Sequence, residues 1–114
     1  MRMKSAAVAA LALALPTLAA EPYEGAWAAK VAWCGHSSSQ TDEVPITISS
    51  KGLEGYEYGC SFASVNKLGN AWIATMVCGA EGENWVETMR MTVSGNTLTL
   101  KADGKRGVKF IRCK

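Results

Sequence analysis

Four cysteines, each on or beside a stretch that alternates like a β-strand, constrain this chain more than any other feature. They are Cys34, Cys60, Cys78 and Cys113. They follow an N-terminal segment that predicts export, and an even number of cysteines in a short exported chain indicates disulfides. The sequence therefore predicts a small exported β-domain with two disulfides.

The first 20 residues have the organisation of a cleavable signal peptide. Arg2 and Lys4 precede an apolar run, 6–15, and Pro16 and small residues follow it. A membrane span needs about 20 apolar residues, so this run is too short to be a retained anchor. We predict cleavage after about Ala20, no transmembrane segment in the mature chain, and a periplasmic location, with secretion as the alternative.

The mature chain, 21–114, is predicted to be one domain. Without Arg2 and Lys4 it carries ten basic and ten acidic residues, of which nine acids lie in 21–87 and six bases in 101–114. There is no C-x-x-C motif, and His36 is the only histidine. Because zinc sites need several histidine or cysteine ligands at close spacing, we predict a structural role for the cysteines, no metal and no cofactor.

Period-two alternation of apolar residues recurs along the whole mature chain and predicts an all-β fold. A meander without covering helices exposes two edges, and closure into a barrel removes them. We therefore predict a small antiparallel barrel of about seven to eight strands. The side chains expected to fill its interior are Trp27, Trp33, Tyr56, Tyr58, Phe62, Trp72 and Met76. The expected strands are 25–34, 44–49, 56–62, 72–78, 85–93, 98–100 and 108–113.

Strand register suggests how the cysteines pair. A hairpin centred near Leu68 and Gly69 places Cys60 and Cys78 opposite each other on one face. Cys34 would then bond Cys113 and join the first strand to the last. The alternative pairing, Cys34 with Cys60 and Cys78 with Cys113, stays open because register can slip by one or two residues.

Short motifs at the two ends of the domain resemble those of known barrels. Gly25-Ala26-Trp27 with Arg112 resembles the Gly-x-Trp and terminal arginine of calycin-type, lipocalin-like barrels. The resemblance implies that the indole packs under the guanidinium and closes the barrel floor, which makes Gly25, Trp27 and Arg112 structural residues. A cation over an indole face contributes about 1 kcal/mol.

The plan of the chain is also similar to two groups of exported bacterial inhibitors. Periplasmic lysozyme inhibitors share the export signal, the paired cysteines and the small barrel. Residues 60–64 are only distantly similar to the inhibitory loop of that group. Metalloprotease inhibitors of the Inh type share the Gly-x-Trp opening, and their late Leu-Thr-Leu stretch followed by Ala-Asp-Gly is similar to 98–104 here. They have one cysteine pair, whereas this chain has four cysteines.

Catalysis and nucleic-acid binding both fit the sequence poorly. His36 beside Ser37 and Ser38 is the one candidate for a base near a nucleophile, and no Gly-x-Ser-x-Gly elbow supports it. We predict no catalytic residue. Export, a mature charge of zero and inward-facing aromatics argue against nucleic acid, and the bases of 101–114 are expected to protect a strand edge.

Binding through loops is the function that remains. The turn 79–85 combines Glu81 and Glu83 with Trp85, and the polar loop after Cys34 offers His36, Ser37 and Ser38. Many peptidoglycan hydrolases are basic, so acidic loops would favour their docking. We predict a periplasmic inhibitor of a peptidoglycan hydrolase, a lysozyme or a lytic transglycosylase, that occludes the enzyme's cleft. The alternatives are an Inh-type protease inhibitor and a non-catalytic ligand-binding or structural protein of the envelope.

Overall fold

The fold is that of a small all-β domain. The computed structural model describes residues 19–114, so the predicted signal peptide lies outside the described residues apart from its last two. Eight strands and one short 3-10 helix, η1, follow one another: β1 (Gly25–Ala28), η1 (Val31–Gly35), β2 (Ile46–Ile48), β3 (Gly52–Gly55), β4 (Tyr58–Leu68), β5 (Ala71–Ala80), β6 (Glu83–Ser94), β7 (Thr97–Ala102) and β8 (Val108–Arg112).

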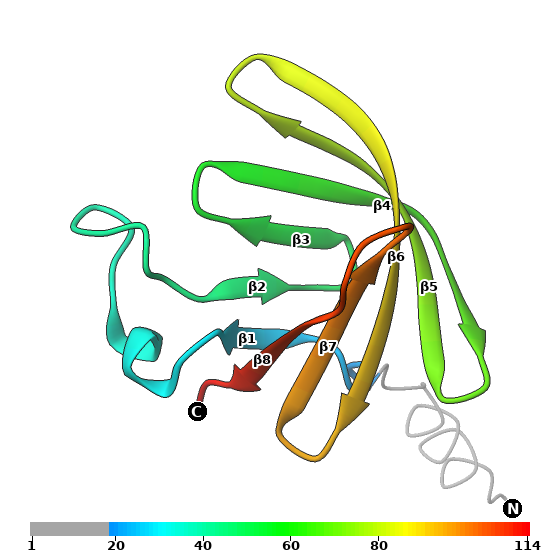
Figure 1. The fold of residues 1–114 in the computed structure, drawn as a ribbon, viewed down its shortest axis with the longest axis horizontal. Helices are drawn as coiled ribbons and strands as arrows, with labels where there is room; N and C mark the ends of the chain where they lie inside the picture. Colours follow the sequence, from blue (N-terminus) through cyan, green and yellow to red (C-terminus); the bar gives the residue numbers. More distant parts are fainter. Residues whose placement is uncertain (1–18) are drawn as a thin grey trace, which may run out of the picture.

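The strands form a closed antiparallel barrel in which each strand pairs with the next in sequence (Figure 1). β8 returns to β1, where Trp27 lies opposite Arg112 and Ala28 opposite Ile111. Beyond this short seam, the Cys113 N–H donates a hydrogen bond to the Ala26 carbonyl over 2.8 Å. The predicted barrel of seven to eight strands is confirmed, and its closure leaves β1 and β8 without open edges.

Tight two-residue turns join the long strands. Between β5 and β6 the turn residues are Glu81, with φ 49°, and Gly82, with φ 82°. Positive φ at both central positions is the pattern of a type I′ turn, which matches the twist of the two strands. The β6–β7 turn is also two residues long and has Gly95 at φ 59°. These turns fix the register of β5, β6 and β7.

The predicted nested disulfide pattern is confirmed. Cys60 lies directly opposite Cys78 on the β4–β5 ladder and is bonded to it, and Cys34 is bonded to Cys113. Cys78 is buried in the core, so one disulfide reinforces the interior of the barrel. The other ties η1 to the end of β8, next to the β1–β8 seam.

One end of the barrel is closed by aromatic side chains. The Trp27 indole is fully buried, and its Nε1 donates a 2.9 Å hydrogen bond to the Tyr23 carbonyl. The Arg112 guanidinium lies 4.1 Å from the indole centroid and donates to the carbonyls of Glu24 and Pro22. This is the arrangement that the Gly-x-Trp resemblance implies. We call this end the floor of the barrel.

The first strand is shorter than its sequence pattern suggests, and the prediction of a strand over 25–34 is wrong. β1 ends at Ala28, and the chain then turns into η1. β2 is only three residues long and β8 ends at Arg112, so a longer β1 would have no partner on either side. Consequently Trp33 lies in η1, half-buried, and does not share a strand face with Trp27.

The strand predicted over 56–62 also differs. Tyr56 and Glu57 form the turn between β3 and β4, with Glu57 at φ 58°, so Tyr56 is exposed and does not point into the core. Glycines on both sides of this segment, Gly55 and Gly59, help the chain reverse direction. The remaining inward residues of that prediction, Tyr58, Cys60 and Phe62, lie on one face of β4.

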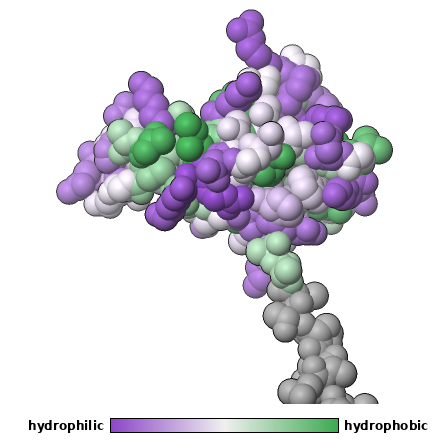
Figure 2. Space-filling model, turned by 90° about the horizontal axis from the view of Figure 1, so that it is seen from below, coloured by the Kyte–Doolittle hydropathy of each residue, from purple (hydrophilic) through white to green (hydrophobic). Residues whose placement is uncertain are grey.

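The outer surface of the barrel carries both apolar and hydrophilic side chains. On the face in Figure 2, apolar side chains form small separate patches among hydrophilic ones. Scattered single apolar residues are normal on a soluble surface and do not by themselves mark an interface. Among the described residues, no helix is long and apolar enough to cross a membrane.

Candidate functional site

The end of the barrel opposite the floor is open and is framed by four connections. Because consecutive strands are antiparallel, alternate connections lie at the same end. The connections at this end are 29–45, the β3–β4 turn at 56–57, the β5–β6 turn at 81–82 and the β7–β8 connection at 103–107. We call this end the mouth.

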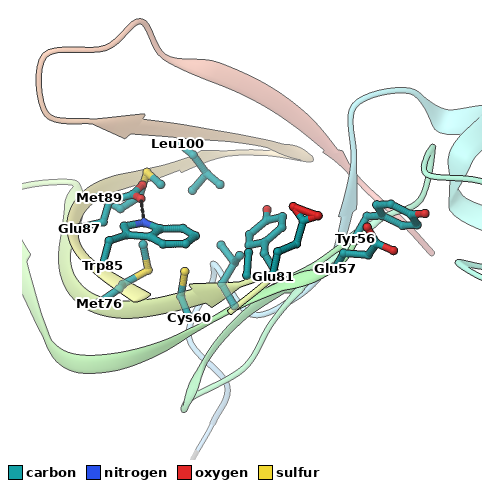
Figure 3. A pocket seen from close by; sticks show the side chains of 12 residues that line it. Tyr56, Glu57, Cys60, Met76, Glu81, Trp85, Glu87, Met89 and Leu100 are labelled. Atoms are coloured by element: carbon teal, nitrogen blue, oxygen red, sulfur yellow. Dashed lines mark hydrogen bonds between the residues drawn. The ribbon is translucent and has the colours of Figure 1, made fainter. Parts of the chain in front are cut away.

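A pocket of about 460 Å³ opens at the mouth (Figure 3). Its inner wall is apolar and sulfur-rich, formed by Leu53, Met76, Met89 and Leu100 with the Cys60 end of a disulfide. The expectation that bulky side chains fill the interior is therefore wrong at this end. Trp33 and Tyr56, two of the side chains counted as filling, lie in η1 and in a turn, and the space above Met76 stays open.

The rim of the pocket is acidic and aromatic. Figure 3 shows Trp85 at one end of the pocket beside Met76 and Met89, with Tyr56 and Glu57 at the other end. The Trp85 Nε1 donates a 2.8 Å hydrogen bond to the Glu87 carboxylate, which holds the ring across the opening. Trp85, Tyr56 and Tyr58 are each 38% exposed. Half-exposed aromatic rings beside carboxylates suit a partner with apolar and cationic groups.

The structure brings together only part of the predicted contact set. Glu81 and Trp85 line the pocket, and Glu83 begins β6 just behind them without lining it. The sequence analysis did not include Tyr56, Glu57, Tyr58 and Glu87 among the contact residues, because it placed them within the predicted strands 56–62 and 85–93. The pair of glycines around Tyr56–Tyr58 was the signal for a turn at this position.

The polar loop that follows η1 is a separate feature. The His36 Nδ1 lies 2.7 Å from the Glu43 carbonyl and donates to it, so this histidine closes the base of its own loop. Ser37 and Ser39 are joined through their hydroxyls at 2.9 Å. His36, Ser37 and Ser38 are exposed and do not line the mouth pocket. The same connection approaches the β3–β4 turn, since Asp42 contributes to raising the pKa of Tyr56, after Glu57 and desolvation.

The opposite side of the mouth is basic. A smaller pocket of about 240 Å³ shares Tyr58, Glu87 and Met89 with the first, and Lys105 and Arg106 line its outer side. The mouth therefore has an acidic side, at the β3–β4 and β5–β6 turns, and a basic side, at the β7–β8 connection. Within residues 19–114, no group of three metal-binding side chains is present.

The pKa of the Tyr58 phenol depends on its surroundings at the mouth. Burial, and secondarily the negative charge of Glu87, raise its pKa above the ordinary value of 10.0. We expect Glu87→Gln to lower the Tyr58 pKa toward 10.0 by removing the smaller cause, with burial still raising it. An NMR titration of the Tyr58 ring carbon checks this, and Glu54→Gln on the outer wall is the control.

Raised tyrosine pKa values also set a pH dependence of stability. Tyr23, Tyr56 and Tyr58 all have pKa values above 10.0 in the folded chain. The unfolded chain therefore loses these protons first as the pH rises. The three tyrosines therefore contribute their full stabilisation of the folded state below pH 10.0, and the free energy of unfolding falls as the pH rises above it. Urea unfolding at increasing alkaline pH measures this fall.

Comparison of the chain with protein-family models, with curated proteins and with solved structures found no match.

Proposed function

We propose that this chain is a non-catalytic inhibitor that binds a basic peptidoglycan hydrolase of the bacterial envelope, a lysozyme or a lytic transglycosylase, through the mouth of the barrel. The observation that supports this proposal is the rim, where three half-exposed aromatic rings stand beside Glu57, Glu81 and Glu87. Aromatic residues are enriched in protein interfaces, and acidic groups accelerate the docking of a basic partner.

The shape of the β5–β6 hairpin fits occlusion of a cleft. Its tip at Glu81 and Gly82, yellow in Figure 1, extends past the end of β7, whose pairing with β6 stops at Met89. The hairpin is held by ten residue pairs, and the Cys60–Cys78 disulfide ties β5 to β4 close to the tip. A rigid tip loses little conformational entropy on binding, which favours affinity.

The test is inhibition of a purified basic lysozyme and of a lytic transglycosylase by the mature chain. We expect stoichiometric loss of activity, relieved by salt because the attraction is electrostatic. Glu81→Lys with Glu83→Lys should weaken inhibition at least about tenfold, since like charges then face the partner. Glu21→Lys with Glu54→Lys makes the same change in net charge outside the rim, at the floor and on the outer face of β3, and should leave inhibition nearly intact.

Two other outcomes would replace this proposal. Inhibition of a metalloprotease, without effect on either hydrolase, would favour the Inh-type alternative. The pocket of about 460 Å³ favours a second candidate, a carrier of a small apolar ligand. Saturable binding of the neutral fluorophore N-phenyl-1-naphthylamine, lost in Met76→Trp and accompanied by no enzyme inhibition, would identify the carrier and reject the inhibitor.

A further inference from the structure

One stretch of the barrel has an unpaired strand edge. β6 pairs with β5 from Glu83 to Thr92, but its pairing with β7 begins only at Met89, opposite Ala102. Residues 83–88 therefore have a strand on one side only. Among the described residues, no strand pairs with them on the side away from β5. We call residues 83–88, on that side, the free edge.

The turns at both ends of β6 define which backbone groups face the free edge. Residues that flank a two-residue hairpin turn form a hydrogen-bonded pair, and bonded and non-bonded pairs alternate from there. Counted from Glu83, the backbone groups of Trp85 and Glu87 face β5. Counted from Ser94 at the other turn, the even-numbered residues of β6 face β7. Both counts agree that Asn84, Val86 and Thr88 direct their N–H and C=O groups to the free edge.

A groove of about 390 Å³ runs along this edge. One wall is the edge itself, and the other is the end of β7 at Ala102 with the β7–β8 connection at Asp103 and Lys105. An added strand would have its backbone next to that of β6 and its side chains alternating between the two faces of the sheet. The edge thus offers a template of three donors and three acceptors beside a ready-made groove.

The two faces of the free edge differ in chemistry. On the mouth side, Glu83, Trp85 and Glu87 alternate along the strand. On the outer side, Val86 is 70% exposed and lies opposite Val77, which is 51% exposed. An added strand would therefore suit basic side chains on the mouth side, next to two carboxylates and an indole face. Apolar side chains on the outer side would pack against the two valines.

We propose that the free edge of β6 binds an extended segment of a partner protein as an added antiparallel strand, with basic and apolar side chains in alternation. A second copy of this chain is a poor occupant, because edge-to-edge pairing would bring two copies of Glu83 and of Glu87 onto one face. The inference goes beyond the proposed function, since it concerns a backbone edge and applies whether or not the partner is a hydrolase.

The experiment uses the mature, oxidised chain labelled with ¹⁵N and the synthetic peptide Ac-Lys-Val-Lys-Val-Lys-Val-NH₂. In the free protein, the amide protons of Asn84, Val86 and Thr88 should exchange fast, and those of Trp85 and Glu87 slowly. The peptide should shift and protect the first three amides saturably. In the proposed register its valines lie opposite Asn84, Val86 and Thr88, so the valine N–H groups bond β6 and the lysine N–H groups face solvent.

Two matched changes separate strand addition from simple charge attraction. Methylation of the backbone nitrogens of the three valines should weaken binding at least about tenfold. Methylation of the backbone nitrogens of the three lysines should change it less than about twofold. In the protein, Val86→Pro removes one free-edge donor, and proline is tolerated at a sheet edge. Val86→Pro should abolish protection at Thr88. Val86→Thr keeps the N–H donor and loses only part of the apolar contact, so it should retain protection at Thr88 even if the peptide binds somewhat more weakly.

The proposal is overturned if the three amides are already protected in the free chain, including by a dimer of it. It is also overturned if millimolar peptide leaves them unshifted, or if both methylated peptides bind equally well. None of these results depends on an enzyme assay. Loss of hydrolase inhibition would therefore leave this inference standing, and failure of peptide binding would leave the mouth of the barrel as the docking surface.

Discussion

Trp27→Ala is expected to lower the free energy of unfolding by about 3–5 kcal/mol. The indole is fully buried in the floor, and its Nε1 donates a hydrogen bond to the Tyr23 carbonyl. Truncation leaves a cavity under Arg112 and removes the ring on which the guanidinium stacks at 4.1 Å. A domain of this size has a total stability of about 5–15 kcal/mol, so the variant should lose a large share of it. Urea unfolding followed by circular dichroism measures the loss.

Trp85→Ala is the matched control, because it removes the same side chain from the other end of the same barrel. Trp85 is 38% exposed and lies over an open pocket. We therefore expect a loss below about 1.5 kcal/mol. Trp27→Phe should fall between the two, since it retains an aromatic ring without the hydrogen bond. Equal losses for the two alanine variants would contradict the assignment of a packed floor and an open mouth.

Much of the barrel could be read from local pattern together with the cysteines. Alternation identified β5, β6 and the first half of β4, where one face is buried; it did not predict that β4 continues to Leu68. The hairpin register then placed Cys60 opposite Cys78, as observed. This worked because a β-hairpin is local: its turn, its pairing and its inward face are all determined within about 20 residues of chain.

Strand ends were less predictable, because they depend on partners distant in the sequence. The alternation of 25–34 continues past Ala28, but β2 and β8 provide only short partners. The chain therefore turns into η1, and Trp33 leaves the core. The same limit applies to the mouth. Gly55 and Gly59 indicate a turn near Tyr56, but the residue at which the turn begins depends on where β3 ends against β2.

The free edge illustrates the same point for function. The sequence marks Glu83 and Trp85 as an acidic turn with an aromatic residue, and both are at the β5–β6 tip. What it does not show is that β7 ends at Ala102, six residues short of covering β6. Unpaired backbone is a property of relative strand lengths. It could not be found from composition or from motif spacing.

Replacing Cys34 and Cys113 with alanine is expected to lower the free energy of unfolding by about 4 kcal/mol. The two cysteines are separated by 79 residues, and a cross-link over so long a loop restricts the unfolded chain strongly. The variant should also show a steeper dependence of stability on urea, because its unfolded state becomes less compact. Cys60 and Cys78 enclose only 18 residues. Replacing them should steepen the urea dependence less. This holds even though the loss of packing around the buried Cys78 also lowers the free energy of unfolding.

Local opening distinguishes the two disulfides further. The β1–β8 seam has only two residue pairs, and the Cys34–Cys113 disulfide lies directly beside it. Without that cross-link, the amide protons of the seam, including that of Cys113 bonded to the Ala26 carbonyl, should exchange faster than those of the β5–β6 ladder. In the variant lacking Cys60 and Cys78 the seam should retain its protection relative to the ladder. If the seam instead exchanged at the same rate with and without the long cross-link, the barrel would be held closed by the Trp27 and Arg112 floor, and the disulfide would act on the unfolded chain alone.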